Sequence, residues 1–323
     1  MSVTHVMGDV HVVDPHLHGT PGSLALYVVD APEPLVVDAG AVDSVGSIYD
    51  ALAALDIARE EVAHLLLSHV HLDHAAGAGH LADGLPNATV HVHDSGAPYL
   101  TEAEALERLV RSVDRATGGQ RVFGDPELVP AERCRLLSGG ERIDLGDRAL
   151  EVIDAPGHAP HHVAAFDPDT EGLFAIDAVG MRLDGRLYPT TPPPGFDLEA
   201  NLDTVDRLRA YDPARVLYGH FGPGSDDPVR ELDRYEWLLP AWVDLVEARR
   251  AEVSAGRAED RREGDGNGGG EGNADEDADG MEHGGSGDEE EVVAAIVDTL
   301  EANWLSPTVH RDVAGVLHYL DRH

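Results

Sequence analysis

The sequence predicts an α/β (α+β) fold in which two β-sheets pack face to face and helices cover their outer faces, giving four layers. Two observations predict it. Over residues 1–225, short apolar strands alternate with segments in which apolar residues recur at helical spacing. A strand followed directly by a His or an Asp occurs in both halves of this region, as in a pseudo-repeat. We therefore expect residues 1–225 to form one domain.

The elements follow one another along this region. Residues 44–55 have helical spacing, and Ser44 is a candidate for the capping residue. Residues 102–116 predict an amphipathic helix. The other expected elements are strands at 23–30, 35–38, 64–68 and 89–93, strands around Arg135, Ile143, Val152, Val163 and Phe174, a helix at 198–210 and a strand at 216–218.

The chain changes character after this domain. Residues 226–263 predict a helical extension whose apolar stripe packs into a core, with Trp237, Leu238, Trp242, Val243 and Val246 as its members. Residues 264–291 are rich in Gly and acidic side chains and cannot bury enough apolar surface to offset the entropy of ordering, so a disordered insertion is expected. Residues 292–323 resume helical periodicity and are expected to form C-terminal helices that pack on the main domain.

The run from His69 to His74 places four metal-ligand side chains directly after an apolar strand. Because side chains alternate along extended chain, His69, His71 and Asp73 can point the same way, and His74 follows as the chain turns. This spacing suits two neighbouring metals, with His69 and His71 on one, and Asp73 and His74 on the other. Three imidazoles and a carboxylate favour zinc over calcium or magnesium, with Fe²⁺ or Mn²⁺ as alternatives.

Three more candidate ligands end apolar strands further along: His158, Asp177 and His220. Strand ends at one edge of a sheet can hold convergent ligands rigidly. An Asp177 carboxylate can bridge two metals, with His158 completing the first site and His220 the second. The residues therefore predict a centre for two Zn²⁺ ions.

These motifs resemble the signature of the metallo-β-lactamase fold hydrolases. Val36-Val37-Asp38-Ala39-Gly40 is similar to an earlier strand-Asp-x-Gly element of that family, and the resemblance implies that Asp38 supports the metal ligands from behind. It covers about residues 8–225 and implies an αββα sandwich with a catalytic domain at 1–225. Gly77–His80, Leu85–Asn87, 157–162 and 191–194 are further similar to an archaeal and bacterial subgroup of unassigned substrate, related to glyoxalase II-like hydrolases.

Some branches of the family fit less well. Glyoxalase II-type enzymes carry a Gly before the bridging Asp and a Thr-Leu-Phe-like run after it, whereas Asp177 lies between Ile176 and Ala178. The flavodiiron branch has Glu where this chain has His71. Nothing like the second domain of the nuclease branch follows. The resemblance therefore implies the metal chemistry of the family more firmly than it implies any one substrate.

The predicted activity is that of a hydrolase in which a metal-bridging hydroxide attacks an ester-like, thioester, lactone or amide bond of a small molecule. Asp73 is the predicted catalytic residue, orienting the nucleophile or passing a proton to the leaving group. The alternative is a mononuclear iron persulfide dioxygenase of the same fold; a phosphodiesterase and a non-catalytic metal-binding module rank lower. Candidates for substrate contact are His162, Arg182, Tyr188 and Phe196.

Composition sets further limits. The net charge is −38 and the chain contains no Lys, which indicates adaptation to a salt-filled cytoplasm, as in a halophilic archaeon. Without a basic patch, neither nucleic acid nor an anionic membrane is an expected partner. Cys134 is the only cysteine and reads as an apolar filler, which excludes an intramolecular disulfide. We expect a cytoplasmic protein that acts on a small molecule, as a monomer or a homodimer.

Overall fold

The computed structural model describes residues 1–183, 185–265, 286–298, 300 and 308–323. Most of the insertion expected to be disordered, residues 266–285, lies outside these ranges. The chain divides into two compact units. Unit 1 comprises residues 1–190 and 197–237, and unit 2 comprises 191–196 and 238–323. The predicted domain boundary at residue 225 thus falls inside unit 1.

Unit 1 contains two large sheets and a hairpin. In sheet order, the first consists of β1 (Ser2–Met7), β2 (Val10–Asp14), β3 (Leu26–Val29), β4 (Leu35–Val37), β5 (His64–Leu66), β6 (Thr89–His93) and β7 (Cys134–Leu137). The second consists of β14 (Arg215–Tyr218), β11 (Gly172–Ile176), β10 (Val163–Asp167), β9 (Ala149–Asp154) and β8 (Arg142–Asp144). The hairpin is β12 (Met181–Leu183) with β13 (Arg186–Tyr188). Strands β4 to β7 pair in parallel, as do β11 and β14.

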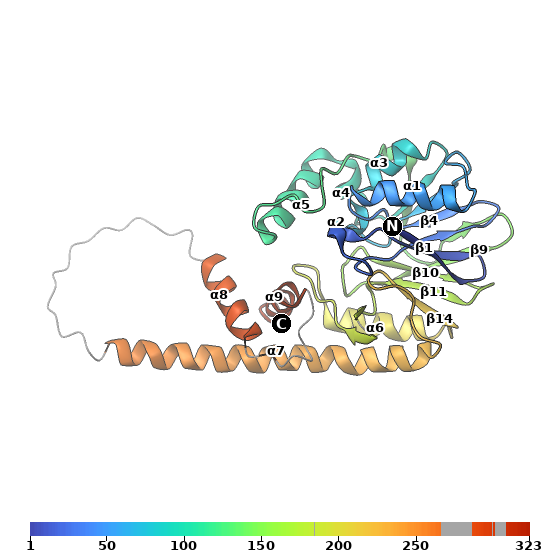
Figure 1. Ribbon diagram of the computed structural model, residues 1–323. Helices are drawn as coiled ribbons and strands as arrows, with labels where there is room; N and C mark the ends of the chain where they lie inside the picture. The colour runs from blue at the N-terminus through green and yellow to red at the C-terminus, as the bar shows by residue number, and fades with distance from the viewer. Residues whose placement is uncertain (184, 266–285, 299, 301–307) are drawn as a thin grey trace. The chain divides into compact units, whose positions relative to one another are not determined.

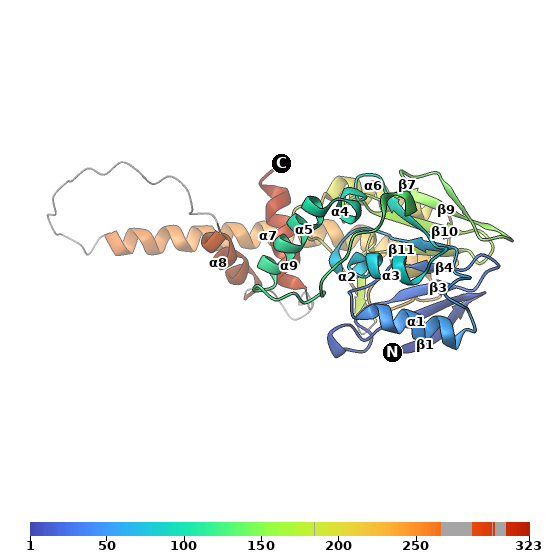
Figure 2. The same cartoon turned by 90° about the horizontal axis from the view of Figure 1, so that it is seen from above.

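Helices flank the two sheets. α1 (Ser44–Ala54) and α3 (Ala78–Gly84) lie on the outer side of the first sheet, and α6 (Leu198–Arg209) lies on the outer side of the second (Figure 1). Seen from above, α1 lies near β1, which agrees with its contacts to β1 and β2 (Figure 2). The short helices α2 (Leu72–Ala75) and α4 (Pro98–Thr101) and the longer α5 (Ala103–Ala116) belong to the connections of the first sheet. The predicted four-layer α/β sandwich is confirmed.

The inner strands β3 and β4 of the first sheet are buried on both faces, which explains their continuous apolar runs. In β3, Leu26 and Val28 join the core beneath the outer helices, whereas Tyr27 and Val29 join the core between the two sheets. β4 divides in the same way, with Val36 on the helix side. Alternate side chains therefore serve two different cores, and the carboxyl ends of the strands are fixed from both sides.

The structure corrects two details of this region. The chain opens on the antiparallel pair β1–β2, which its half-exposed residues did not reveal. The prediction that Ser44 caps α1 is wrong: the N-cap residue is Asp43, and the Ser44 hydroxyl is buried without a hydrogen-bond partner among the described residues. The Ser44 N–H instead closes a turn onto the Ala41 carbonyl at 2.9 Å, so its side chain faces the core.

Apart from the turn at residues 191–196, the described part of unit 2 is mostly helical. A single helix, α7 (Pro228–Asp265), supplies its first part from Leu238 onward, followed by α8 (Ser286–Val297) and α9 (Val309–Leu320). Helix α8 thus begins six residues before the expected start at 292. The packing of residues 292–323 on the main domain stays a prediction. Within the described residues, no helix has the length and apolar character needed to cross a bilayer.

The apolar stripe of α7 is largely as predicted. Leu238, Trp242 and Val246 recur every four residues and are buried, as is Val243. The Trp242 indole N–H donates to the Thr191 hydroxyl at 3.1 Å within the same unit. Assigning Trp237 to the stripe is wrong, because its side chain is 69% exposed. It lies about a quarter turn from Leu238, outside the buried face.

Candidate metal centre

Every predicted ligand lies at or just beyond the carboxyl end of a strand. In the first sheet, Asp38 follows β4 directly and His69 follows β5. His71 precedes α2, whose first turn carries Asp73 and His74. In the second sheet, the ligand candidates His158, Asp177 and His220 follow β9, β11 and β14. Because β4 pairs with β5 and β11 with β14 in parallel, their carboxyl ends meet at common sheet edges.

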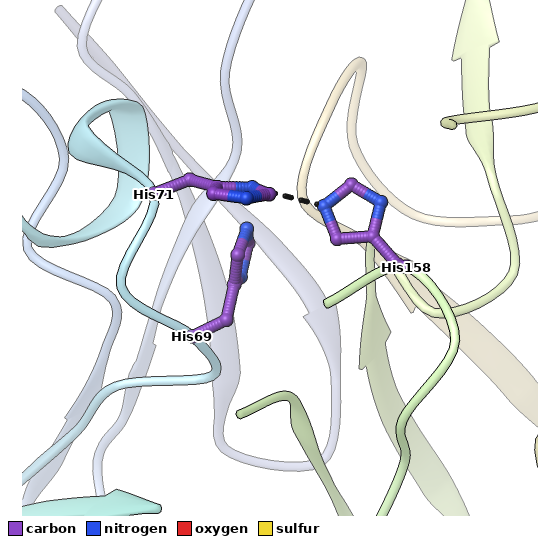
Figure 3. Close-up of side chains that lie close together, drawn as sticks. All are labelled: His69, His71 and His158. Atoms are coloured by element: carbon purple, nitrogen blue, oxygen red, sulfur yellow. Dashed lines mark hydrogen bonds between the residues drawn. The ribbon is translucent and has the colours of Figure 1, made fainter. Parts of the chain in front are cut away.

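The structure brings the seven predicted ligands together in overlapping groups. His69, His71 and His158 form what we call the first cluster, and Asp73, His74 and His220 the second; the ligand atoms within each group lie within 4.8 Å of one another. Figure 3 shows the rings of the first cluster converging, with His158 Nε2 3.1 Å from His71 Nδ1.

Asp177 lies between the two clusters. Its Oδ2 atom is 3.6 Å from His158 Nε2, 3.7 Å from His74 Nε2 and 3.4 Å from His220 Nε2. Its Oδ1 atom is buried and has no hydrogen-bond partner among the described residues. A carboxylate with this placement can contact a cation in either cluster.

The hydrogen bonds behind the rings fix which nitrogen faces the centre. His158 Nδ1 donates to the Thr190 carbonyl at 3.2 Å, and His220 Nδ1 donates to the Ser23 carbonyl at 2.9 Å. His74 Nδ1 lies 2.9 Å from Asp38 Oδ2. Carbonyl and carboxylate oxygens only accept hydrogen bonds, so each of these three imidazoles, when neutral, carries its proton on Nδ1 and presents an Nε2 lone pair to the centre.

This arrangement fits a transition-metal ion. His69 Nε2 is fully buried and has no hydrogen-bond partner among the described residues. His74 Nε2 and His220 Nε2 face each other at 3.4 Å, although both carry lone pairs when their protons are on Nδ1. Facing lone pairs and an unpaired buried nitrogen are costly unless a cation binds between them. Imidazole nitrogens and carboxylate oxygens are the donors zinc takes where no thiolate is present.

The carboxylates give the second cluster a strong preference for positive charge. Burial lowers the pKa of His74, but Asp177, Asp73 and the hydrogen bond that His74 donates to Asp38 outweigh it and raise that pKa to about 10. Burial opposes protonation of His220 as well, and Asp177 raises its pKa nonetheless. Burial raises the pKa of Asp177, yet His220 and His74 bring it well below the ordinary value. The second cluster therefore attracts either a proton or a metal ion.

His69, in the first cluster, has the opposite character. Burial, together with the neighbouring imidazoles of His74 and His71, holds the pKa of His69 well below its usual value. The His69 ring is therefore neutral at physiological pH, which is the state that binds a metal.

Glycine is required at residue 219 for the donors to approach one another. A Cβ atom there would lie 2.6 Å from Asp177 Oδ1 and 2.8 Å from His74 Cε1, well inside van der Waals contact. The backbone is also unusual at strand ends beside the centre, because Asp38 and Ile176 have φ angles of 62° and 50°. Such left-handed conformations at non-glycine residues persist only where the surroundings enforce them.

The four predicted substrate contacts have different environments. His162 is fully buried and stacks on His69, with ring centroids 4.8 Å apart. Arg182 pairs with Glu231 at 3.3 Å and donates to the Pro223 carbonyl. Tyr188 is the buried last residue of β13. Phe196 belongs to unit 2, where its ring packs against Tyr319. Their role in binding substrate stays a prediction.

The sequence analysis did not single out His161, which the structure places beside the first cluster. Its ring lies 5.9 Å from that of His71 and 6.1 Å from that of Tyr99, and all three side chains are partly exposed. The remaining members of the first cluster are fully buried. Access to the first cluster is therefore on the side of His71. The only signal in the sequence was the position of His161 three residues after His158 on one loop.

Comparisons with known proteins show the family of this chain. The sequence model of the metallo-β-lactamase superfamily matches residues 18–220. The metallo-β-lactamase fold-containing protein ST1585 of Sulfurisphaera tokodaii is 29% identical over 199 residues, which are 61% of this chain and 72% of that protein. Its crystal structure aligns with a TM-score of 0.59 and 25% identity, covering 72% of this chain and 86% of the other.

Two further relatives carry the names of enzymes. The acyl-coenzyme A thioesterase MBLAC2 of Gallus gallus is 30% identical over 163 residues, which are 48% of this chain and 54% of that protein. A hydroxyacylglutathione hydrolase of Hyphomonas neptunium is 27% identical over 203 residues, 56% of this chain and 73% of the other. The superfamily model covers well over half of the residues of this chain, so the chain belongs to the metallo-β-lactamase superfamily.

Proposed function

We propose that the protein is a binuclear metal-dependent hydrolase that cleaves a thioester, ester-like, lactone or amide bond of a small molecule. The observation that carries the proposal is the convergence of five imidazoles and two carboxylates, in which hydrogen bonds behind the rings turn Nε2 lone pairs of His74, His158 and His220 toward one space.

The donors divide between two ions. His69, His71 and His158 would hold one ion, and Asp73, His74 and His220 the other, with Asp177 within reach of both. We propose zinc at both positions, since the donors are imidazole and carboxylate and the only cysteine, Cys134, belongs to β7. Bound there, the ions would supply a water that ionises near neutral pH and a Lewis acid for a carbonyl oxygen.

The three carboxylates around the centre have different access to a substrate. Asp38 is completely buried behind His74 and Asp177 is 2% exposed, whereas Asp73 is 8% exposed. Asp73 Oδ2 also lies 3.5 Å from His220 Nε2, within the second cluster. Asp73 is therefore the carboxylate placed to orient a water or to exchange a proton with a leaving group.

Thioesters are the first substrates to test. Both enzyme-named relatives have thioester substrates by their names, an acyl-coenzyme A and a hydroxyacylglutathione. The net charge of −38 favours a small molecule over nucleic acid or an anionic membrane, in a salt-rich cytoplasm.

The test is a substrate panel in molar KCl with zinc-loaded, iron-loaded and metal-free protein. The panel contains S-acyl glutathione, acyl-coenzyme A, a lactone, an amide, a phosphodiester and glutathione persulfide. We expect zinc-dependent release of thiol or acid, lost in Asp73→Ala and kept in His80→Gln. His80 is a matched control because its ring is partly exposed and bonds to the Asp125 carbonyl. Turnover of the persulfide by the iron form alone, with consumption of oxygen, would replace this proposal with the dioxygenase.

A further inference from the structure

We propose that the Ser68 hydroxyl is a positioning group for His69. It donates a hydrogen bond to Asp38 and accepts one from His69, so that the buried Asp38 carboxylate orients His74 directly and His69 through Ser68. This rests on the proposed metal centre, but not on the reaction catalysed there. It assigns a role in metal affinity to a side chain that itself has no contact with a metal.

Asp38 accepts three hydrogen bonds. Its Oδ1 atom accepts the Ser68 backbone N–H at 2.7 Å, and its Oδ2 atom accepts the Ser68 hydroxyl at 2.9 Å and His74 Nδ1 at 2.9 Å. Asp38, Ser68 and His74 are each no more than 1% exposed. No water competes for these bonds, and all three donors converge on one carboxylate.

The position of the protons follows from this arrangement. A hydroxyl has one hydrogen, and the Ser68 hydrogen is directed at Asp38, which as a carboxylate can only accept. The second contact of Ser68 Oγ is His69 Nδ1 at 2.9 Å, so here the oxygen accepts and Nδ1 carries the hydrogen. His69 must therefore present its Nε2 lone pair, and this is the buried nitrogen without a partner among the described residues.

The branch through Ser68 differs from the other supports of the centre. His158 and His220 are held by the backbone carbonyls of Thr190 and Ser23, which no side-chain substitution removes. His74 is held by Asp38 directly. Of these four imidazoles, His69 alone is held through an intervening hydroxyl. Removing that hydroxyl should therefore weaken the first cluster and spare the second.

Substitution of Ser68 leaves the surrounding backbone bonds in place. The Ser68 N–H still reaches Asp38, and the Ser68 carbonyl still accepts the Val163 N–H at 2.8 Å, a bond that links the two sheets. Ser68→Ala thus removes the hydroxyl with little else. Ser44 provides the matched control, because it is equally buried and its hydroxyl has no partner among the described residues.

The experiment titrates metal-free protein with Co²⁺ in two backgrounds, followed by visible absorption in molar KCl. His220→Ala retains the first cluster and His158→Ala retains the second. We expect Ser68→Ala to raise the Co²⁺ dissociation constant about 10- to 100-fold in the first background, as loss of an outer partner usually does. In the second background we expect less than about a threefold change. Ser68→Thr should restore affinity, Ser44→Ala should change neither constant, and Asp38→Asn should weaken both.

An unchanged first-cluster constant in Ser68→Ala, or equal losses in both backgrounds, would overturn the inference. A second measurement uses the unsubstituted protein, so that it does not depend on the folding of any variant. Long-range ¹⁵N–¹H correlation spectra of the metal-free protein should show His69 with its proton on Nδ1. A proton on Nε2 would also overturn the inference. Co²⁺ binding without hydrolysis of any substrate would count against the proposed function alone.

Discussion

The stability of the metal-free protein should fall as pH rises from 6.5 to 9, which is unusual for so acidic a chain. The carboxylates of Asp177, Asp73 and Asp38 raise the pKa of buried His74 from 6.5 to about 10 in the folded state. A raised pKa stabilises the fold fully below the unfolded value, and this contribution is lost as pH rises toward the folded value. At about 1.4 kcal/mol per tenfold change in proton affinity, the ceiling is about 5 kcal/mol, of which about 3 kcal/mol should be lost by pH 9.

The assay is urea unfolding with a chelator in molar KCl at pH 6.5, 7.5 and 9. His220 adds to the slope with the same sign, because its pKa is also raised. The lowered pKa values of His69, His91 and His162 act below pH 6.5 and do not enter this window. The variant His74→Gln should lose most of the slope. Saturating zinc should reverse it, because the metal binds the deprotonated ring. A stability that is flat or rises with pH in the metal-free protein would refute the reasoning.

Three further predictions concern the centre and the surface. Gly219→Ala should abolish metal binding in the second cluster, because its Cβ would overlap Asp177 and His74; retention of two equivalents of zinc in elemental analysis would contradict this. Asp73→Ala should bind at most one zinc tightly and lose turnover at every zinc concentration, whereas near-native turnover would remove its catalytic role. The melting temperature should rise between low and molar KCl because the net charge of −38 is screened, and a melting temperature independent of salt would favour codon bias over halophilic adaptation as the origin of the composition.

The sequence predicted the fold because the fold depends on local patterns, and the same patterns singled out the seven candidate donors. Apolar runs such as those of β4 and β5 signal strands buried on both faces, and a His or Asp directly after them falls at a sheet edge. The order of ligands along the chain was enough to anticipate that seven donors converge. The structure adds that the ligand atoms of each cluster lie within 4.8 Å of one another.

What the sequence could not supply depends on contacts between distant residues. The carbonyls of Ser23 and Thr190 behind His220 and His158 have no side-chain signal, because any residue offers a carbonyl. The β1–β2 hairpin was missed because its residues are half-exposed and lack a clean apolar alternation. Trp237 was misassigned because a tryptophan next to an apolar stripe looks like a member of it until the helix is placed.

The distribution of the donors over two sheets has a consequence for folding. His71 and His158 are 87 residues apart in the chain, and His74 and His220 are 146 apart. A metal ion shared by either pair closes a long loop, as a disulfide does, and covalent cross-links of that span are worth on the order of 4–5 kcal/mol of chain entropy. With Cys134 as its only cysteine, the protein has no disulfide within the chain to serve this purpose. Metal loading would then act as a reversible cross-link between the two halves of the sandwich, so that metal supply governs how much folded protein survives.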